Sequence, residues 1–131
     1  MADALITIKI DRAGHTPIVR AGVSIRNAVA LVRDQEGEPD ATVTIALEGS
    51  EERLMVAVSG AHAFLGLERP DGVFQYVPDR FHGEVSRTFI VSGQVTEIAA
   101  RNVLSLEGAA GVVEEWIRKG EDSSSGRWER Q

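Results

Sequence analysis

The strongest constraint on the fold is a series of short apolar segments separated by turn residues, which begins shortly after Pro39. In residues 42–47, alternate positions carry Val43, Ile45 and Leu47, a period of two that puts them on one face of a strand. The turns between segments include Asp-Gly, which is typical of a β-hairpin when it lies between two apolar runs. The segments are residues 42–47, 53–59, 63–67, 73–77, 87–91 and 94–98. Such a series predicts a largely antiparallel sheet built of serial hairpins.

Two other segments have the period of an α-helix. After Ser24, a residue type that caps helix N-termini, the pattern predicts a helix of about three turns that is ended by Gly37-Glu38-Pro39-Asp40. Its inward face carries Ile25, Ala28, Val29 and Val32. Residues 106–119 form a longer apolar stripe, with Ser105 as the N-cap and Gly120 as the stop. We expect Gly108 and Gly111 to mark places where this second helix lies close to the sheet.

The start of the chain predicts a strand at residues 5–10 and a short return strand at 18–20. Together the elements predict an α+β fold: a largely antiparallel sheet with an early helix and a C-terminal helix packed on it. With no linker and no internal repeat, residues 1–131 are expected to form one domain. Residues 121–131 would be a polar tail that ends in a packed Trp128, returning as a short strand or lid.

The composition excludes several classes of function. No cysteine is present, so thiolate metal sites, disulfides and cysteine nucleophiles are ruled out, and a reducing cytoplasm is the expected location. The net charge of −6 disfavours direct binding to nucleic acid and favours a basic protein partner. Neither a signal peptide nor an apolar run long enough to span a membrane is expected from the sequence.

Motifs that carry catalytic chemistry are not found. The chain has no phosphate-binding glycine loop and no Gly-x-Ser-x-Gly nucleophile elbow. His82-Gly83-Glu84 matches half of a zinc deaminase signature, but the other half needs two cysteines. His15 and His62 lie beside glycines in predicted turns and are interpreted as surface residues. The sequence therefore predicts no enzyme, no metal and no cofactor.

One irregular loop, between residues 78 and 85, could form an interface. Aromatic and charged side chains on loops are common anchors for protein partners. The alternative is that the aromatic residues cap the edge of the core while the charged groups are solvated. The candidate partner-binding residues are Tyr76, Asp79, Phe81, His82 and Glu84.

The last third of the chain has a more specific pattern. Ala99-Ala100-Arg101-Asn102-Val103-Leu104-Ser105 leads into the second helix, which ends Trp116-Ile117-Arg118-Lys119-Gly120, and Arg127-Trp128-Glu129 follows after a polar run. In order and spacing, these segments resemble the type-one immunity (Imm) proteins of bacterial polymorphic toxin systems. The resemblance is good over residues 94–129. The family usually has a proline in the link and another after the helix glycine, and this chain lacks both, which leaves the course of the tail open.

The resemblance implies a protein that neutralises a cognate toxin domain, often a nuclease or nucleic-acid deaminase, by occluding its active site. Such toxins tend to be basic, so an acidic inhibitor would have complementary charge. The resemblance does not identify the contact residues, because immunity surfaces diverge with their partners. Two other readings stay open: a small α+β ligand-binding or enzymatic domain with a site near Tyr76, His82 and Glu84, and a structural or adaptor subunit.

Overall fold

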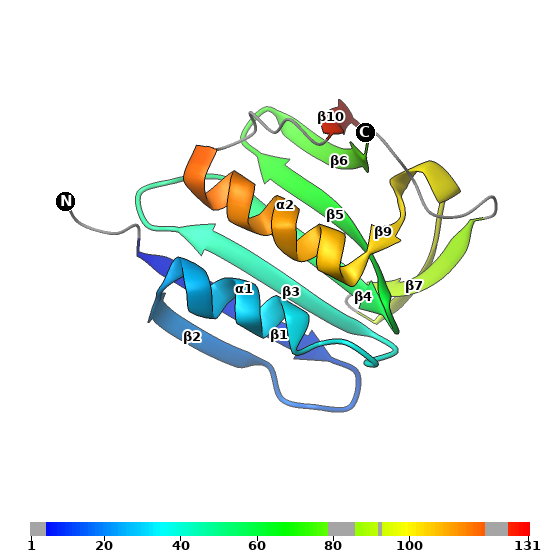
Figure 1. Ribbon diagram of the computed structural model, residues 1–131, viewed down its shortest axis with the longest axis horizontal. Helices are drawn as coiled ribbons and strands as arrows, with labels where there is room; N and C mark the ends of the chain where they lie inside the picture. Colours follow the sequence, from blue (N-terminus) through cyan, green and yellow to red (C-terminus); the bar gives the residue numbers. More distant parts are fainter. Residues whose placement is uncertain (1–4, 79–85, 92, 120–125) are drawn as a thin grey trace.

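The computed structural model describes residues 5–78, 86–91, 93–119 and 126–131, and confirms the α+β class. Figure 1 shows two helices, α1 (Ile25–Arg33) and α2 (Leu106–Lys119), lying side by side on one face of a large antiparallel sheet. The order of the main strands is β10-β6-β5-β4-β3-β1-β2. Their bounds are β1 Ile6–Arg12, β2 Ile18–Val23, β3 Ala41–Leu47, β4 Arg53–Ser59, β5 His62–Arg69, β6 Gly72–Pro78 and β10 Gly126–Arg130.

Alternation along the strands explains why the helices cover one face. Val43, Ile45 and Leu54 are fully buried beneath the helices, as the period of two predicts. From the helices, Val32 and Trp116 join the same core. Removing this much apolar surface from water is the main stabilising contribution to the fold.

Local hydrogen bonds fix where each helix begins. The Ser24 hydroxyl accepts a hydrogen bond from the Asn27 N–H at 3.1 Å, and the Ser105 hydroxyl accepts one from the Gly108 N–H at 3.0 Å. Both predicted N-caps are thus confirmed, since each serine satisfies an N–H that the helix itself leaves unpaired. Side by side on the sheet, the helices are further joined by Arg33, which donates two hydrogen bonds to the Glu107 carboxylate.

The glycines of α2 were interpreted wrongly. Gly108 and Gly111 are both exposed, on the side of the helix away from the sheet. A Cβ on Gly111 would meet no neighbouring atom within 4 Å. Small alanines, Ala109 and Ala110, lie at the buried positions instead.

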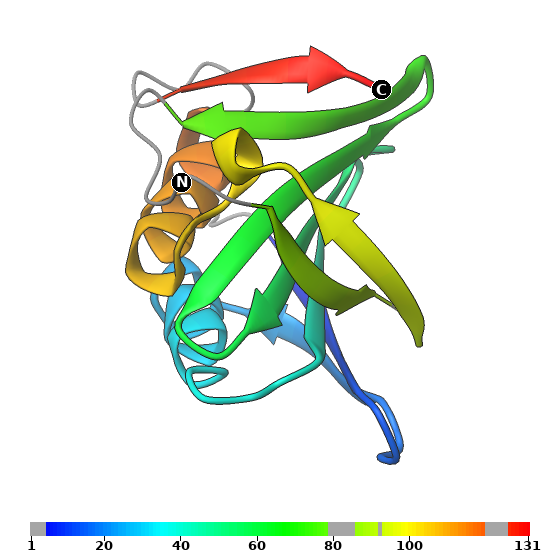
Figure 2. The same ribbon diagram turned by 90° about the vertical axis from the view of Figure 1, so that its right-hand side faces the viewer.

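One predicted hairpin does not belong to the main sheet. Strands β7 (Arg87–Val91) and β8 (Gln94–Ile98) form a separate two-stranded sheet. Figure 2 shows this hairpin on the side of the main sheet opposite the helices. A second apolar cluster fills the space beneath it, comprising Ala57, Phe64, Phe89, Ile98 and Val103. The segment that returns from β8 contains a short 3-10 turn, η1 (Ala100–Asn102), and strand β9 (Leu104–Ser105), which pairs with β5.

No helix within the described ranges is long and apolar enough to cross a lipid bilayer.

Candidate functional site

The predicted interface loop is only partly described. Of its five candidate residues, Asp79, Phe81, His82 and Glu84 lie outside the described residues, and their role stays a prediction. Tyr76, in β6, is described and is only 1% exposed. A partner that approached this region would therefore not meet the Tyr76 ring directly.

Tyr76 is covered by the C-terminal strand. Trp128 of β10 lies opposite it, with the two ring centroids 5.1 Å apart and the planes at 68°. Such an edge-to-face pair is a favourable aromatic geometry. Gly126, at the start of β10, passes so close that a Cβ there would lie 2.5 Å from the Tyr76 hydroxyl oxygen and 2.4 Å from the Val77 carbonyl oxygen. The Tyr76 side chain is thus the surface against which β10 packs.

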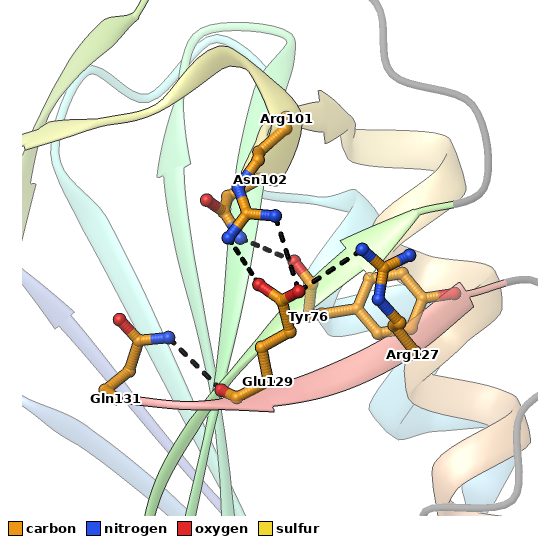
Figure 3. A network of polar contacts seen from close by, with 6 residues as sticks. All are labelled: Tyr76, Arg101, Asn102, Arg127, Glu129 and Gln131. Carbon is orange, nitrogen blue, oxygen red and sulfur yellow. Dashed lines mark hydrogen bonds and ion pairs between the residues drawn. The ribbon is translucent and has the colours of Figure 1, made fainter.

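A polar network holds the same strand from its other face, as Figure 3 shows. Arg101 of η1 donates hydrogen bonds to both carboxylate oxygens of Glu129, and Arg127 donates a third at 3.2 Å. The Asn102 side chain donates to the Tyr76 carbonyl oxygen at 3.2 Å. The Arg101 guanidinium, with help from Arg127, holds the pKa of the Glu129 carboxyl below its usual value.

This arrangement connects the two halves of the C-terminal pattern. The link before α2 contains Arg101 and Asn102, and the tail contains Arg127, Trp128 and Glu129. Although Arg101 and Glu129 are 28 positions apart in the sequence, their side chains meet on the face of β10 opposite Trp128. A short link, a helix and a returning strand therefore form one connected unit at the edge of the sheet.

The face of the sheet opposite the helices offers a second candidate surface. Register places Lys9, Thr44, Met55 and Gly66 in one row across four neighbouring strands on this face. The β7–β8 hairpin covers only part of it, over Ala57 and Phe64. Along the row, Lys9 is exposed, Thr44 and Met55 are half-buried, and Gly66 is buried.

Beside the hairpin, the face of the main sheet opposite the helices, which we call the open face, is hollowed. Two adjoining hollows of about 300 and 320 Å³ share three lining residues, Lys9, Asp11 and Thr42. The first reaches Ile90 and Gly93 of the hairpin, and the second extends over the middle of the sheet. This surface has no signal in the sequence. Alternation along β1 and β3 does place Asp11 and Thr42 opposite the helices, but nothing in the sequence indicated that the hairpin would stand beside them.

Potential metal ligands do not converge in the described part of the chain. No three His, Asp or Glu side chains there lie close enough to hold one ion. His15 is exposed in the turn between β1 and β2, and His62 begins β5.

Comparison with known proteins adds no family assignment: no family model matches the sequence, and neither does any curated protein.

Proposed function

We propose that the chain is an immunity protein, which neutralises a cognate bacterial toxin domain by binding it and occluding its active site. The observation that carries the proposal is the connected C-terminal unit. The residues on which the resemblance depends, in the link and in the tail, contact one another through Arg101–Glu129 and through Asn102 and Trp128 on Tyr76. The spacing between the link and the tail is therefore the spacing that lets these residues meet in the fold.

Electrostatics support the same role. A net charge of −6 on 131 residues would speed the encounter with a basic toxin such as a nuclease or nucleic-acid deaminase domain. Such a toxin acts on nucleic acid inside the cell, so the proposed place of action is the cytoplasm. Inhibition by occlusion needs a rigid, shape-matched surface and no catalytic group of its own.

Co-expression tests the proposal. The C-terminal domain of a large protein encoded beside this gene is induced in a bacterial host, with and without this chain. We expect growth to be restored by the chain, and the two proteins to co-purify as a complex whose affinity falls as salt is raised. If every neighbouring candidate toxin kills equally well in the presence of the folded chain, the proposal is wrong.

Charge reversal asks whether the loop after β6 makes the contact. Asp79→Lys and Glu84→Lys together should weaken protection if this loop meets a basic toxin. The matched control is Glu48→Lys together with Glu51→Lys, which also reverses two exposed charges, in the turn after β3. Equal protection by the loop variant and the control would remove Asp79 and Glu84 from the contact surface.

A further inference from the structure

The smaller hollow on the open face is bounded by several charged side chains. It lies where β1 ends and β3 begins, against the β7–β8 hairpin, and has a volume of about 300 Å³. Lys9, Asp11 and Arg12 line it from β1, Thr42 from the start of β3, Asp40 from just before that strand, and Ile90 from β7. We call it the Asp40 pocket.

Thr42, which lines this pocket, has an unsatisfied hydroxyl. The residue is 2% exposed, and its Oγ1 is buried with no hydrogen-bond partner among the residues that the structure describes. Its cross-strand neighbours are Asp11 on one side and Ala57 on the other. Nearly all buried hydroxyl groups in proteins are hydrogen-bonded, because leaving one unpaired is unfavourable. A ligand group that reached Thr42 would remove this penalty.

The pocket is lined by two cations and two carboxylates, and one of the carboxylates has no ion-pair partner in the described part of the chain. Lys9 lies 3.8 Å from the Asp11 carboxylate. Arg12 donates two hydrogen bonds to the Gln35 side-chain oxygen and lies 3.9 Å from Glu38.

Asp40 has no ion-pair partner in the described ranges, whereas each cation of the lining lies beside another carboxylate, Lys9 beside Asp11 and Arg12 beside Glu38, which is outside the lining. The group of the lining that is left to bind a ligand charge is therefore a carboxylate, which suits a cation.

We propose that the Asp40 pocket receives an arginine side chain of the protein partner. The Asp40 and Asp11 carboxylates and the Thr42 hydroxyl provide oxygen acceptors from two adjacent strands. A guanidinium group has five N–H donors in a planar fork, so it can serve several acceptors at once, whereas a lysine ammonium is a compact point charge. This inference rests on the proposed function, since a nucleic-acid-directed toxin is rich in arginine where it binds phosphate.

A titration that does not need the toxin tests the pocket. The ¹⁵N-labelled protein is titrated with N-acetyl-arginine methylamide, and in parallel with the citrulline analogue, which has nearly the same shape but no charge. We expect the amide resonances of Asp11, Asp40 and Thr42 to shift with the arginine compound and not with the citrulline compound. Asp40→Asn should weaken the arginine affinity about tenfold, the loss expected for one charge-assisted hydrogen bond.

Two further variants keep the result interpretable. Glu48→Gln removes one negative charge at the opposite end of β3 and should leave the arginine affinity unchanged. Thr42→Val keeps the shape of the side chain and removes only the hydroxyl, so it should weaken binding several-fold while the protein stays folded. Equal shifts with arginine and citrulline, or equal arginine affinities for Asp40→Asn and Glu48→Gln, would overturn the inference.

The outcome separates this inference from the proposed function. If the chain protects against a toxin but binds arginine nowhere near Asp40, the pocket is not the contact and the immunity role stands. If the pocket binds arginine but the folded chain protects against no neighbouring toxin, the immunity role fails.

Discussion

Replacing Gly126 with alanine should specifically destabilise the docking of the C-terminal strand. The backbone of Gly126 does not need the left-handed conformation, so alanine is not excluded by φ. The obstacle is space. A Cβ would lie 2.4 Å from the Val77 carbonyl oxygen and 2.6 Å from the Tyr76 ring carbon Cζ, well inside normal contact distance. The carbonyl belongs to the paired strand β6 and cannot move without disturbing the ladder.

The loss in the free energy of unfolding depends on which part of the structure shifts to accommodate the new methyl group. Overpacking of this kind costs about 1–3 kcal/mol in the free energy of unfolding. If β10 instead detaches from β6, the protein loses the Trp128–Tyr76 ring contact. That contact contributes about 0.5–1.5 kcal/mol in addition to the free energy from burying the two rings. For a domain of this size, 1–3 kcal/mol corresponds to a fall in Tm of about 3–12 °C.

Gly111→Ala is the matched control, because it makes the same chemical change at an exposed helical position with no neighbour within 4 Å. Alanine has a higher helix propensity than glycine, so this variant should be more stable by up to about 1 kcal/mol. Urea denaturation followed by tryptophan fluorescence measures both variants. A Gly126→Ala protein as stable as the wild type would refute the tight packing of β10 against Tyr76 and Val77.

Three further predictions concern polar groups. Thr42→Val should raise the free energy of unfolding by about 1–3 kcal/mol, because it removes a buried hydroxyl that has no partner among the described residues. Urea denaturation measures the change, and a loss of stability would show that the hydroxyl is satisfied. Glu129 has a lowered pKa, so its stabilising contribution is present above the usual value of 4.5 and is lost as pH falls through the folded pKa. Glu129→Gln should therefore lose less stability than the wild type between about pH 5 and pH 3; parallel loss in both proteins would contradict this. Arg33→Gln breaks an exposed contact between the helices and should cost less than about 1 kcal/mol in thermal or urea unfolding, whereas a larger loss would mean that the pair fixes helix packing.

Most elements of the fold could be predicted because their patterns are local. The alternation of Val43, Ile45 and Leu47 and the serine caps at Ser24 and Ser105 depend on neighbours within four residues, and the structure confirms them. The return strand after the first turn was predicted too short: it extends to Val23.

What could not be predicted depends on contacts between distant segments. The β7–β8 hairpin has the same alternation as the other strands, and nothing local shows that Phe89 packs on Phe64 across the main sheet instead of extending it. For the same reason, the hollow beside the hairpin had no signal in the sequence. The glycines of α2 misled because glycine is tolerated both at close approaches and on an exposed helix surface.

The candidate site was predicted in part. Trp128 was expected to pack against the fold, and it does contact Tyr76. The Arg101–Glu129 contact was not foreseen, since two charged residues far apart in sequence could equally have been solvated. The roles of Asp79, Phe81, His82 and Glu84 stay predictions, to be tested by the charge reversals.

An inhibition titration gives the most direct test of the immunity role. A fixed amount of the purified toxin domain from the neighbouring gene is assayed on its nucleic-acid substrate while this chain is added in increasing amounts. We predict that activity falls linearly and reaches zero at one molecule of this chain per toxin, as expected for tight occlusion of the active site. Full toxin activity in the presence of excess folded chain would contradict the proposal.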